Sequence, residues 1–274
     1  AFMFAKLCIL AFPNFEKIIA MNVVITGASK GIGKAIAIEL AALGATCILL
    51  SRNLTNLQQT IKELPVAHGQ AHACHAVDFK DVDALKKLVD SITKEQNIDI
   101  LINNTGGPSA GPIETADPLA FQAAFSQHLV CNHILAQAVI PAMKQNGWGR
   151  IINVISTSVR IPLDNLGVSN TIRAAVASWS KTMSNELAVH GITVNSLLPG
   201  FISTARLEAV AENFAARANI EKAAMQAQMR ASVPAKRFGS PAEIAAVAAF
   251  VASPAASYLN GICIPVDGGR TGSI

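Results

Sequence analysis

Apolar runs of strand length alternate with helical hydrophobic patterns along most of this chain. Runs rich in β-branched residues indicate strands, and apolar residues spaced three and four apart indicate helices. The expected strands cover residues 23–26, 46–50, 71–77, 98–103, 150–155, 192–197 and 262–266. The expected helices cover residues 31–43, 54–64, 82–96, 118–145, 168–190 and 241–252. Strands that alternate with helices predict βαβ units and a doubly wound parallel sheet in an α/β fold.

Two segments fall outside this alternation. Residues 201–238 are rich in Ala and Met and predict two short helices inserted before the last helix. Residues 1–20 are apolar near their start, interrupted by Lys6 and stopped by Pro13, and are too short to span a bilayer. We expect residues 1–20 to be an extension outside the fold, with a membrane-targeting segment as the weaker alternative. Residues 21–274 then form one domain, because no repeat or low-complexity linker divides them.

Composition excludes several classes of protein. Hydrophobic residues make up 51% of the chain and charged residues 15%, which is typical of a globular protein. The net charge of +4 comes from scattered residues without a Lys/Arg run, so no nucleic-acid partner is expected. Five cysteines without a C-x-x-C pair favour reduced thiols and a cytoplasmic protein. His72 and His75 flank Cys74, but strand alternation puts His75 on the opposite face, so no metal site is expected.

A glycine-rich segment, TGASKGIG, follows the first expected strand and opens the first helix. Glycines at positions 27, 31 and 33 allow a tight turn and a close approach of the backbone to a ligand. The helix N-terminus then presents free N–H groups to a pyrophosphate. In this context the motif predicts a dinucleotide site in a Rossmann-like fold.

The end of the second strand indicates which dinucleotide binds. NAD-binding folds usually place Asp or Glu about 20 residues past the glycines, to hold the ribose 2′-hydroxyl. No acidic residue lies between Glu39 and Glu63, and the strand ends instead at Ser51, Arg52 and Asn53. Arg52, together with Lys30 of the glycine turn, suits a 2′-phosphate. The sequence therefore favours NADP(H), although both cations also fit ordinary surface positions.

The segment GRIINVISTSVRIPLDNLGVSNTIRAAVASWSK, which begins at Gly149, resembles the active-site half of the short-chain dehydrogenase/reductase family. The likeness extends from about residue 22 to residue 269, and the chain resembles 3-oxoacyl-carrier-protein reductases in particular. It implies an adenine contact at Asp78 and cofactor contacts in the NNTG and PGFIST segments. The cofactor residues implied by the motif and the resemblance together are Gly27, Ser29, Lys30, Gly31, Ile32, Gly33, Ser51, Arg52, Asn53, Asp78, Asn104, Gly106, Arg173, Pro199, Gly200, Ile202 and Thr204. The family also implies a homotetramer or homodimer.

The catalytic positions depart from the family pattern. The family places a serine thirteen residues before Tyr-x-x-x-Lys, and an asparagine in the long middle helix. This chain has Ser156, but Ser169 stands at the tyrosine position and Arg173 at the lysine position. Alignment on Pro141, which ends that helix in the family, puts His128 at the asparagine position. The only tyrosine, Tyr258, lies far downstream.

An alkyl hydroxyl is far less acidic than a phenol, so Ser169 cannot simply replace the tyrosine. One hypothesis is that His128 delivers the proton, directly or through water and Ser169, because imidazole titrates near neutral pH. Another is that His128 only packs or faces solvent, and His133 on the same helix is a competing candidate. A third is that Ser156, Ser169 and Arg173 together polarise the substrate carbonyl, with Arg173 as an oxyanion partner.

Two functions remain open at this stage. The first is an NADP(H)-dependent oxidoreductase of a small carbonyl/alcohol pair, with residues 201–238 as a lid over the substrate. The second is an NADP(H)-binding sensor or scaffold without redox turnover, which the missing tyrosine favours. Phe201, Phe214, Met225 and Met229 could form an apolar pocket wall, although apolar helix positions more often belong to a core.

Overall fold

The computed structural model describes residues 18–272 and contains a seven-stranded, fully parallel sheet. Its strand order is β3-β2-β1-β4-β5-β6-β7, which confirms the doubly wound α/β fold. The strands are β1 (Asn22–Thr26), β2 (Thr46–Ser51), β3 (Ala73–Ala76), β4 (Ile100–Asn103), β5 (Gly149–Val154), β6 (Ile192–Pro199) and β7 (Cys263–Val266).

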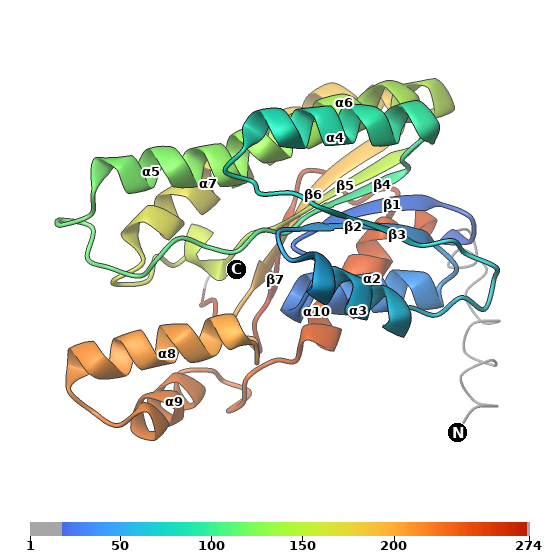
Figure 1. The fold of residues 1–274 in the computed structure, drawn as a ribbon. Coiled ribbons are helices and arrows are strands. Elements are labelled where there is room, and N and C mark those ends of the chain that lie inside the picture. The colour runs from blue at the N-terminus through green and yellow to red at the C-terminus, as the bar shows by residue number, and fades with distance from the viewer. Residues whose placement is uncertain (1–17, 273–274) are drawn as a thin grey trace.

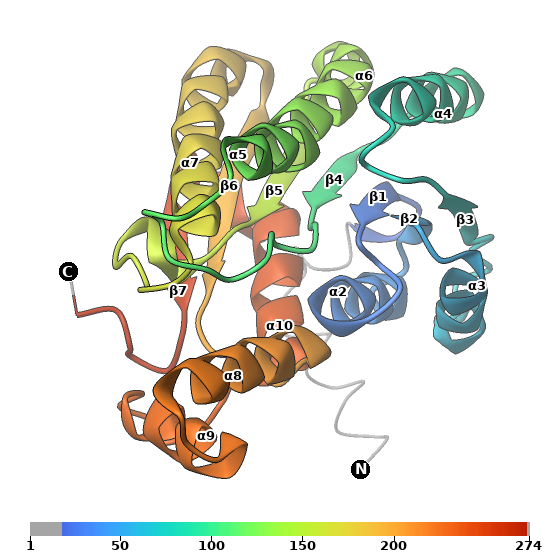
Figure 2. The same cartoon turned by 60° about the vertical axis from the view of Figure 1, so that its left-hand side comes forward.

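Helices cover both faces of this sheet (Figure 1). One layer contains α2 (Gly31–Ala42), α3 (Leu54–Glu63) and α10 (Pro241–Ala252). The other contains α4 (Val82–Glu95), α5 (Pro118–Phe125), α6 (Cys131–Asn146) and α7 (Gly167–Leu187). The insertion forms α8 (Ala205–Ala218) and α9 (Lys222–Ala231), as expected, and these two helices lie together outside both layers (Figure 2).

Alternation along the strands sends side chains into two separate cores. In β1, Val23 and Ile25 pack with α2 and α10, while Val24 packs with α4 and α6 on the opposite face. All three side chains are fully buried. Burial on both faces explains why the strand sequences are continuously apolar rather than alternating.

The long helix expected over residues 118–145 is interrupted. A π-helical turn, Ser126–Val130, separates α5 from α6 and contains His128. A π-helical turn inserts one extra residue per turn, and such turns are frequent at functional sites. Pro141 lies inside α6 rather than at its end, and the helix continues to Asn146 before Gly147 adopts a left-handed conformation.

The N-terminal boundary of the fold precedes residue 21. Ile18 is fully buried against the α2 side of the sheet, and the backbone N–H of Ala20 donates to Gly44 O at 3.1 Å. Residues 18–20 therefore pack with the domain, contrary to the expected extension over residues 1–20. The rest of that expectation, over residues 1–17, lies outside the described residues.

The strand order reverses between β1 and β4, and this reversal positions the ligand site. Strands β2 and β3 follow β1 in one direction, while β5, β6 and β7 follow β4 in the other. In open parallel sheets, ligands bind outside the carboxyl ends of the strands at such a switch point. Gly27 directly follows β1 and Asn104 directly follows β4, so both lie at the mouth of this crevice.

Candidate functional site

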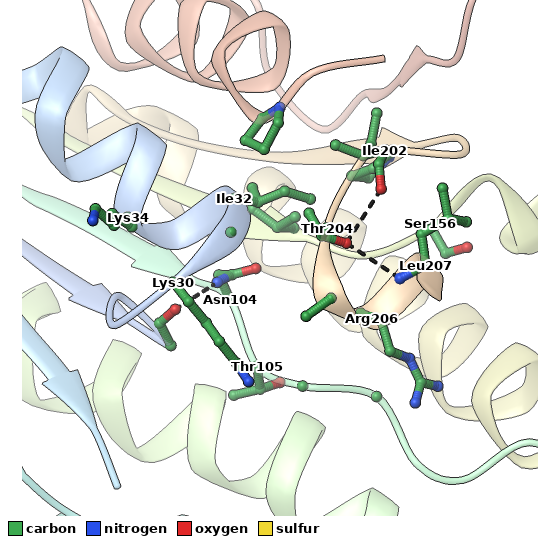
Figure 3. Close-up of a pocket in the computed structure, with 18 of the residues that line it drawn as sticks. Lys30, Ile32, Lys34, Asn104, Thr105, Ser156, Ile202, Thr204, Arg206 and Leu207 are labelled. Carbon is green, nitrogen blue, oxygen red and sulfur yellow. Dashed lines mark hydrogen bonds between the residues drawn. The ribbon is translucent and has the colours of Figure 1, made fainter. Parts of the chain in front are cut away.

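A cavity of about 1110 Å³ opens at the carboxyl ends of the strands. It is lined by residues from the glycine turn, the ends of β2, β4, β5 and β6, and the starts of α7 and α8. Figure 3 shows Lys30 and Ile32 of the glycine turn on one side, and Ser156 and Arg206 on the other. Of the cofactor and catalytic residues expected from the sequence, every one lines this cavity except Gly33 and His128.

The glycine turn brings the backbone of α2 to the cavity. Gly27 has φ of +59°, and a Cβ there would lie 2.1 Å from Asn104 O, so only glycine fits. The N-cap residue Lys30 makes no side-chain capping bond, which leaves the first N–H groups of α2 available to a ligand. Gly33 does not line the cavity but packs behind it, since a Cβ there would lie 2.4 Å from Gly27 O.

The β2 end of the cavity carries polar groups without a protein partner. Ser51 Oγ is buried and has no hydrogen-bond partner within the described residues. Arg52 is exposed beside it and forms none of the ion pairs found in residues 18–272. Asn53 accepts a hydrogen bond from Asn56 N at 2.8 Å and so caps α3. An unpaired hydroxyl and a free guanidinium at one point suit an anionic ligand group.

The PGFIST segment forms the opposite wall and begins α8. Thr204 Oγ1 donates to Ile202 O at 3.2 Å and accepts from Leu207 N at 3.3 Å, which makes Thr204 the N-cap of α8 (Figure 3). A Cβ on Gly31 would lie 3.4 Å from Thr204 Cγ2. The start of α8 is therefore in close contact with the glycine turn across the cavity.

Two serines project into the cavity from different elements. Ser156 follows β5, and its Oγ accepts a hydrogen bond from Ser158 N at 3.0 Å. Because this bond uses an oxygen lone pair, the hydroxyl proton of Ser156 stays free to be donated. Ser169 comes from the first turn of α7 and lines the same cavity. The only tyrosine, Tyr258, is fully exposed and does not line it.

Arg173 joins the ends of two strands beneath these serines. Its Nη1 donates to Val154 O at 2.9 Å and its Nη2 donates to Thr105 O at 3.2 Å. Burial, and secondarily the charge of Arg206, lowers the pKa of Arg173 to about 10. The guanidinium therefore stays positively charged at neutral pH, with both of its described hydrogen bonds directed to carbonyl groups.

His128 does not suit the role of direct proton donor. It is buried, does not line the cavity, and its Nδ1 is hydrogen-bonded to Thr105 Oγ1. Burial, followed by the charges of Arg173 and Arg206, lowers the pKa of His128 to about 2. The imidazole is therefore neutral at physiological pH and holds no acidic proton to deliver.

Arg206 is the principal lining residue that sequence reasoning missed. It lies two residues after Thr204, in the first turn of α8, and its Nη2 donates to Pro108 O at 2.6 Å. The only signal for Arg206 in the sequence was its position just after the PGFIST segment, for which the family resemblance implies cofactor contacts. Of the expected apolar wall, Phe201 lines the cavity, and Phe214, Met225 and Met229 do not. The two methionines pack with Leu207 between α8 and α9.

Other features of the chain have structural roles. His72 Nδ1 accepts from Cys47 N at 3.0 Å, and within residues 18–272 no cluster of His, Cys, Asp and Glu could hold a metal ion. None of the helices in that same range has the length and apolar character needed to cross a membrane.

The family model described as "Enoyl-(Acyl carrier protein) reductase" matches residues 27–271. This chain belongs to the NAD(P)-dependent short-chain dehydrogenase/reductase family. The match includes the glycine turn, the serine pair, Arg173 and the α8–α9 insertion within one family domain.

Relatives cover nearly the whole chain. The NADPH-dependent reductase BacG of Bacillus subtilis is 36% identical over 252 residues, which is 91% of this chain and 97% of that protein. The 3-oxoacyl-[acyl-carrier-protein] reductase FabG of Vibrio cholerae is 34% identical, over 93% of this chain and 98% of the relative. The crystal structure of L-sorbose reductase from Gluconobacter frateurii, complexed with NADPH and L-sorbose, superposes with a TM-score of 0.86 at 30% identity. It covers 93% of this chain and 98% of its own.

The depressed pKa of His128 predicts a stability that depends on pH. Below about pH 6.5 the unfolded chain protonates this imidazole, whereas the folded chain does not until about pH 2. The neutral imidazole of His128 therefore contributes to the free energy of unfolding above about pH 6.5, and this contribution is lost as the pH falls. Between pH 7 and pH 5, we expect the free energy of unfolding to fall about 1–2 kcal/mol more in the native protein than in His128→Asn.

Urea unfolding at the two pH values measures this difference. His133→Asn is the matched control, because His133 lies exposed in α6. An identical pH dependence in the native protein and His128→Asn would contradict a neutral, buried imidazole.

Proposed function

We propose that this protein is an NADP(H)-dependent oxidoreductase that interconverts a small carbonyl compound and its alcohol. One observation carries the proposal: Ser156, Ser169 and Arg173 line the same cavity as the glycine turn of α2. Hydride transfer needs the nicotinamide and the carbonyl held in contact, and one continuous cavity provides for this. The names of BacG and of the sorbose reductase complex support the same class of chemistry.

The residues at the β2 end fit NADP(H) better than NAD(H). Arg52 and the unpartnered Ser51 hydroxyl would hold the ribose 2′-phosphate, with Lys30 adding positive charge. The free N–H groups at the start of α2 would bind the pyrophosphate. Asn104, Gly106 and the segment from Pro199 to Thr204 would position the nicotinamide half. When bound, the reduced cofactor supplies a hydride equivalent.

The chain's own residues would then stabilise the carbonyl oxygen. Ser156 donates its free hydroxyl proton as a hydrogen bond to that oxygen, and the charge of Arg173 stabilises the negative charge that develops on it. The carbonyl carbon gains the hydride, and the oxygen gains a proton from solvent water relayed by Ser169. No phenol assists this transfer, so the reaction lacks a contribution that is typically worth 10²–10⁴ in rate.

We further propose that α8 and α9 act as a lid over the substrate. Thr204, Arg206, Leu207 and Val210 all line the cavity from the start of α8. The two helices pack on each other through Leu207, Ala211 and Met229, so they can move as one unit. Closure of such a unit would exclude water from the reacting carbonyl.

A second function, binding of NADP(H) without turnover, is favoured by one observation. Both described hydrogen bonds of Arg173 go to backbone carbonyls, and these bonds suit a purely structural residue as well. The two functions share the cofactor site and differ in whether any carbonyl is reduced.

The first test follows NADPH consumption at 340 nm with a panel of ketones, oxo acids and sugars. We expect turnover with at least one substrate, and Ser156→Ala should lower kcat/KM about 10²-fold because it removes a hydrogen bond to the developing oxyanion. The affinity for NADPH, measured by fluorescence, should change little. Ser178→Ala, an exposed serine of α7, is the control. Tight NADPH binding without consumption on the whole panel would support the sensor function instead.

A second prediction concerns the two altered positions together. Replacing Ser169 with Tyr and Arg173 with Lys restores a phenol beside a cation, which can act as a general acid. We expect kcat to rise about 10²-fold on a substrate that the native protein already reduces. Each single variant serves as a control for the pair. A loss of the existing activity in the double variant would mean that Ser169 and Arg173 run a different mechanism.

A third prediction concerns the cofactor. Arg52→Asp removes the cation proposed to bind the 2′-phosphate and places a like charge against it, so NADPH affinity should fall about 10²-fold. NADH affinity should change less than about threefold, since NADH lacks that phosphate. Lys62→Asp, in the last turn of α3, makes the same change of charge away from the cavity. Equal losses for both cofactors would overturn the assignment.

A further inference from the structure

Two guanidinium groups converge beside Gly107 at the substrate end of the cavity. A Cβ built on Gly107 would lie 3.2 Å from Nη2 of Arg206 and 3.7 Å from Nη2 of Arg173. Gly107 has no side chain, so the space between the two cations is left open. Both cations and Gly107 line the cavity.

Neither cation has an acidic partner in the part of the chain that the structure describes. Arg206 donates to Pro108 O, and Arg173 donates to Val154 O and Thr105 O. The ion pairs in this part of the chain involve other residues. Among the described residues, Asp78 is the only acid that lines the cavity, and it follows β3, which pairs with β2 at the opposite end of the cavity from Arg206. The substrate end therefore carries two positive charges and no negative one.

Such an arrangement is unfavourable without a counter-ion. Like charges held close together repel each other, and partial burial strengthens the repulsion. Burial, and secondarily the charge of Arg206, lowers the pKa of Arg173, and burial followed by the charges of Arg173 and Arg206 lowers the pKa of His128. An anion placed beside Gly107 would relieve this repulsion and could accept hydrogen bonds from both guanidiniums.

We propose that Arg173 and Arg206 form a binding site for an anionic group of the substrate, a carboxylate or a phosphate. This inference rests on the proposed function, because it takes the molecule bound beside Ser156 to be the carbonyl substrate. The substrate class is then a small carbonyl compound that also carries an acid group, rather than a neutral ketone. Arg206 is a specificity-determining residue in this arrangement. Gly107 provides the room that the acid group needs.

Matched pairs of compounds test the site through binding, independently of turnover. The pairs are levulinate with methyl levulinate, 2-oxobutanoate with its methyl ester, and dihydroxyacetone phosphate with dihydroxyacetone. Titration calorimetry on the NADPH-loaded protein should show at least one acid binding 10-fold or more tighter than its neutral partner. Arg206→Met should reduce that acid preference about 10- to 100-fold, the range of a charge-assisted hydrogen bond, and Arg206→Lys should restore part of it. The carboxylate and phosphate pairs distinguish the two kinds of anion.

Arg217→Met is the matched control, because Arg217 lies at the far end of the same helix and does not line the cavity. An acid preference that persists in Arg206→Met, or its absence from all pairs in the native protein, overturns the anion site. A large loss of NADPH affinity in Arg206→Met, with the preference intact, would assign Arg206 to the cofactor instead.

The outcome also separates this inference from the proposed function. If an acid binds in a way that depends on Arg206 but NADPH is not consumed, the anion site is supported and the oxidoreductase function is rejected. If NADPH is consumed only with neutral carbonyl compounds, the oxidoreductase function is supported and the anion site is rejected.

Discussion

The hydrogen bonds between Thr26 and Asn104 hold together the part of the structure on which the site depends. Asn104 N donates to Thr26 Oγ1 at 2.8 Å, Thr26 Oγ1 donates to Asn104 O at 3.1 Å, and Asn104 Nδ2 lies 3.3 Å from both Thr26 O and Gly27 O. These bonds tie the carboxyl ends of β1 and β4 at the point where the strand order reverses. They also orient the glycine turn and, through it, the N-terminus of α2. The ligand cavity exists because this junction turns both chain segments outward.

The hydrogen bonding of the site depends on an arginine at the position where the family has a lysine. A planar guanidinium has five N–H donors. Arg173 uses two of them in hydrogen bonds that connect β5 to the loop after β4. Its fixed positive charge contributes to keeping His128 neutral, and His128 in turn contacts Thr105 within the same loop. The site therefore provides hydroxyl donors and positive charge rather than an acidic phenol. In the proposed reaction, such a set of groups stabilises an oxyanion, and the proton comes from solvent water.

The elements themselves followed closely from the sequence, and the departures have local causes. The helix Pro241–Ala252 was predicted to the residue because Ser240 and Glu243 form a capping box and Pro241 stands at its first position. The π-helical turn at His128 was missed because a single widened turn inside a long helical segment leaves no distinct signal in the apolar pattern. The expected helix ran past Pro141 to residue 145, and α6 does continue past this exposed proline, to Asn146. Ile18 was missed because a short apolar segment gives no sign of what it packs against.

The sequence by itself determined the α/β fold and the family, and it predicted a set of dinucleotide-binding residues, because periodicity, glycine spacing and motif order are local properties of the chain. It also located Ser169 and Arg173 by counting from Ser156. Only the tertiary structure decided what surrounds those residues. It buried His128 next to two cations, it left the Ser156 hydroxyl free to donate, and it brought Arg206 of α8 opposite Arg173 of α7. The protonation state of a side chain depends on its burial and on the charges that other elements bring close to it. The spacing of residues along one segment specifies neither of these.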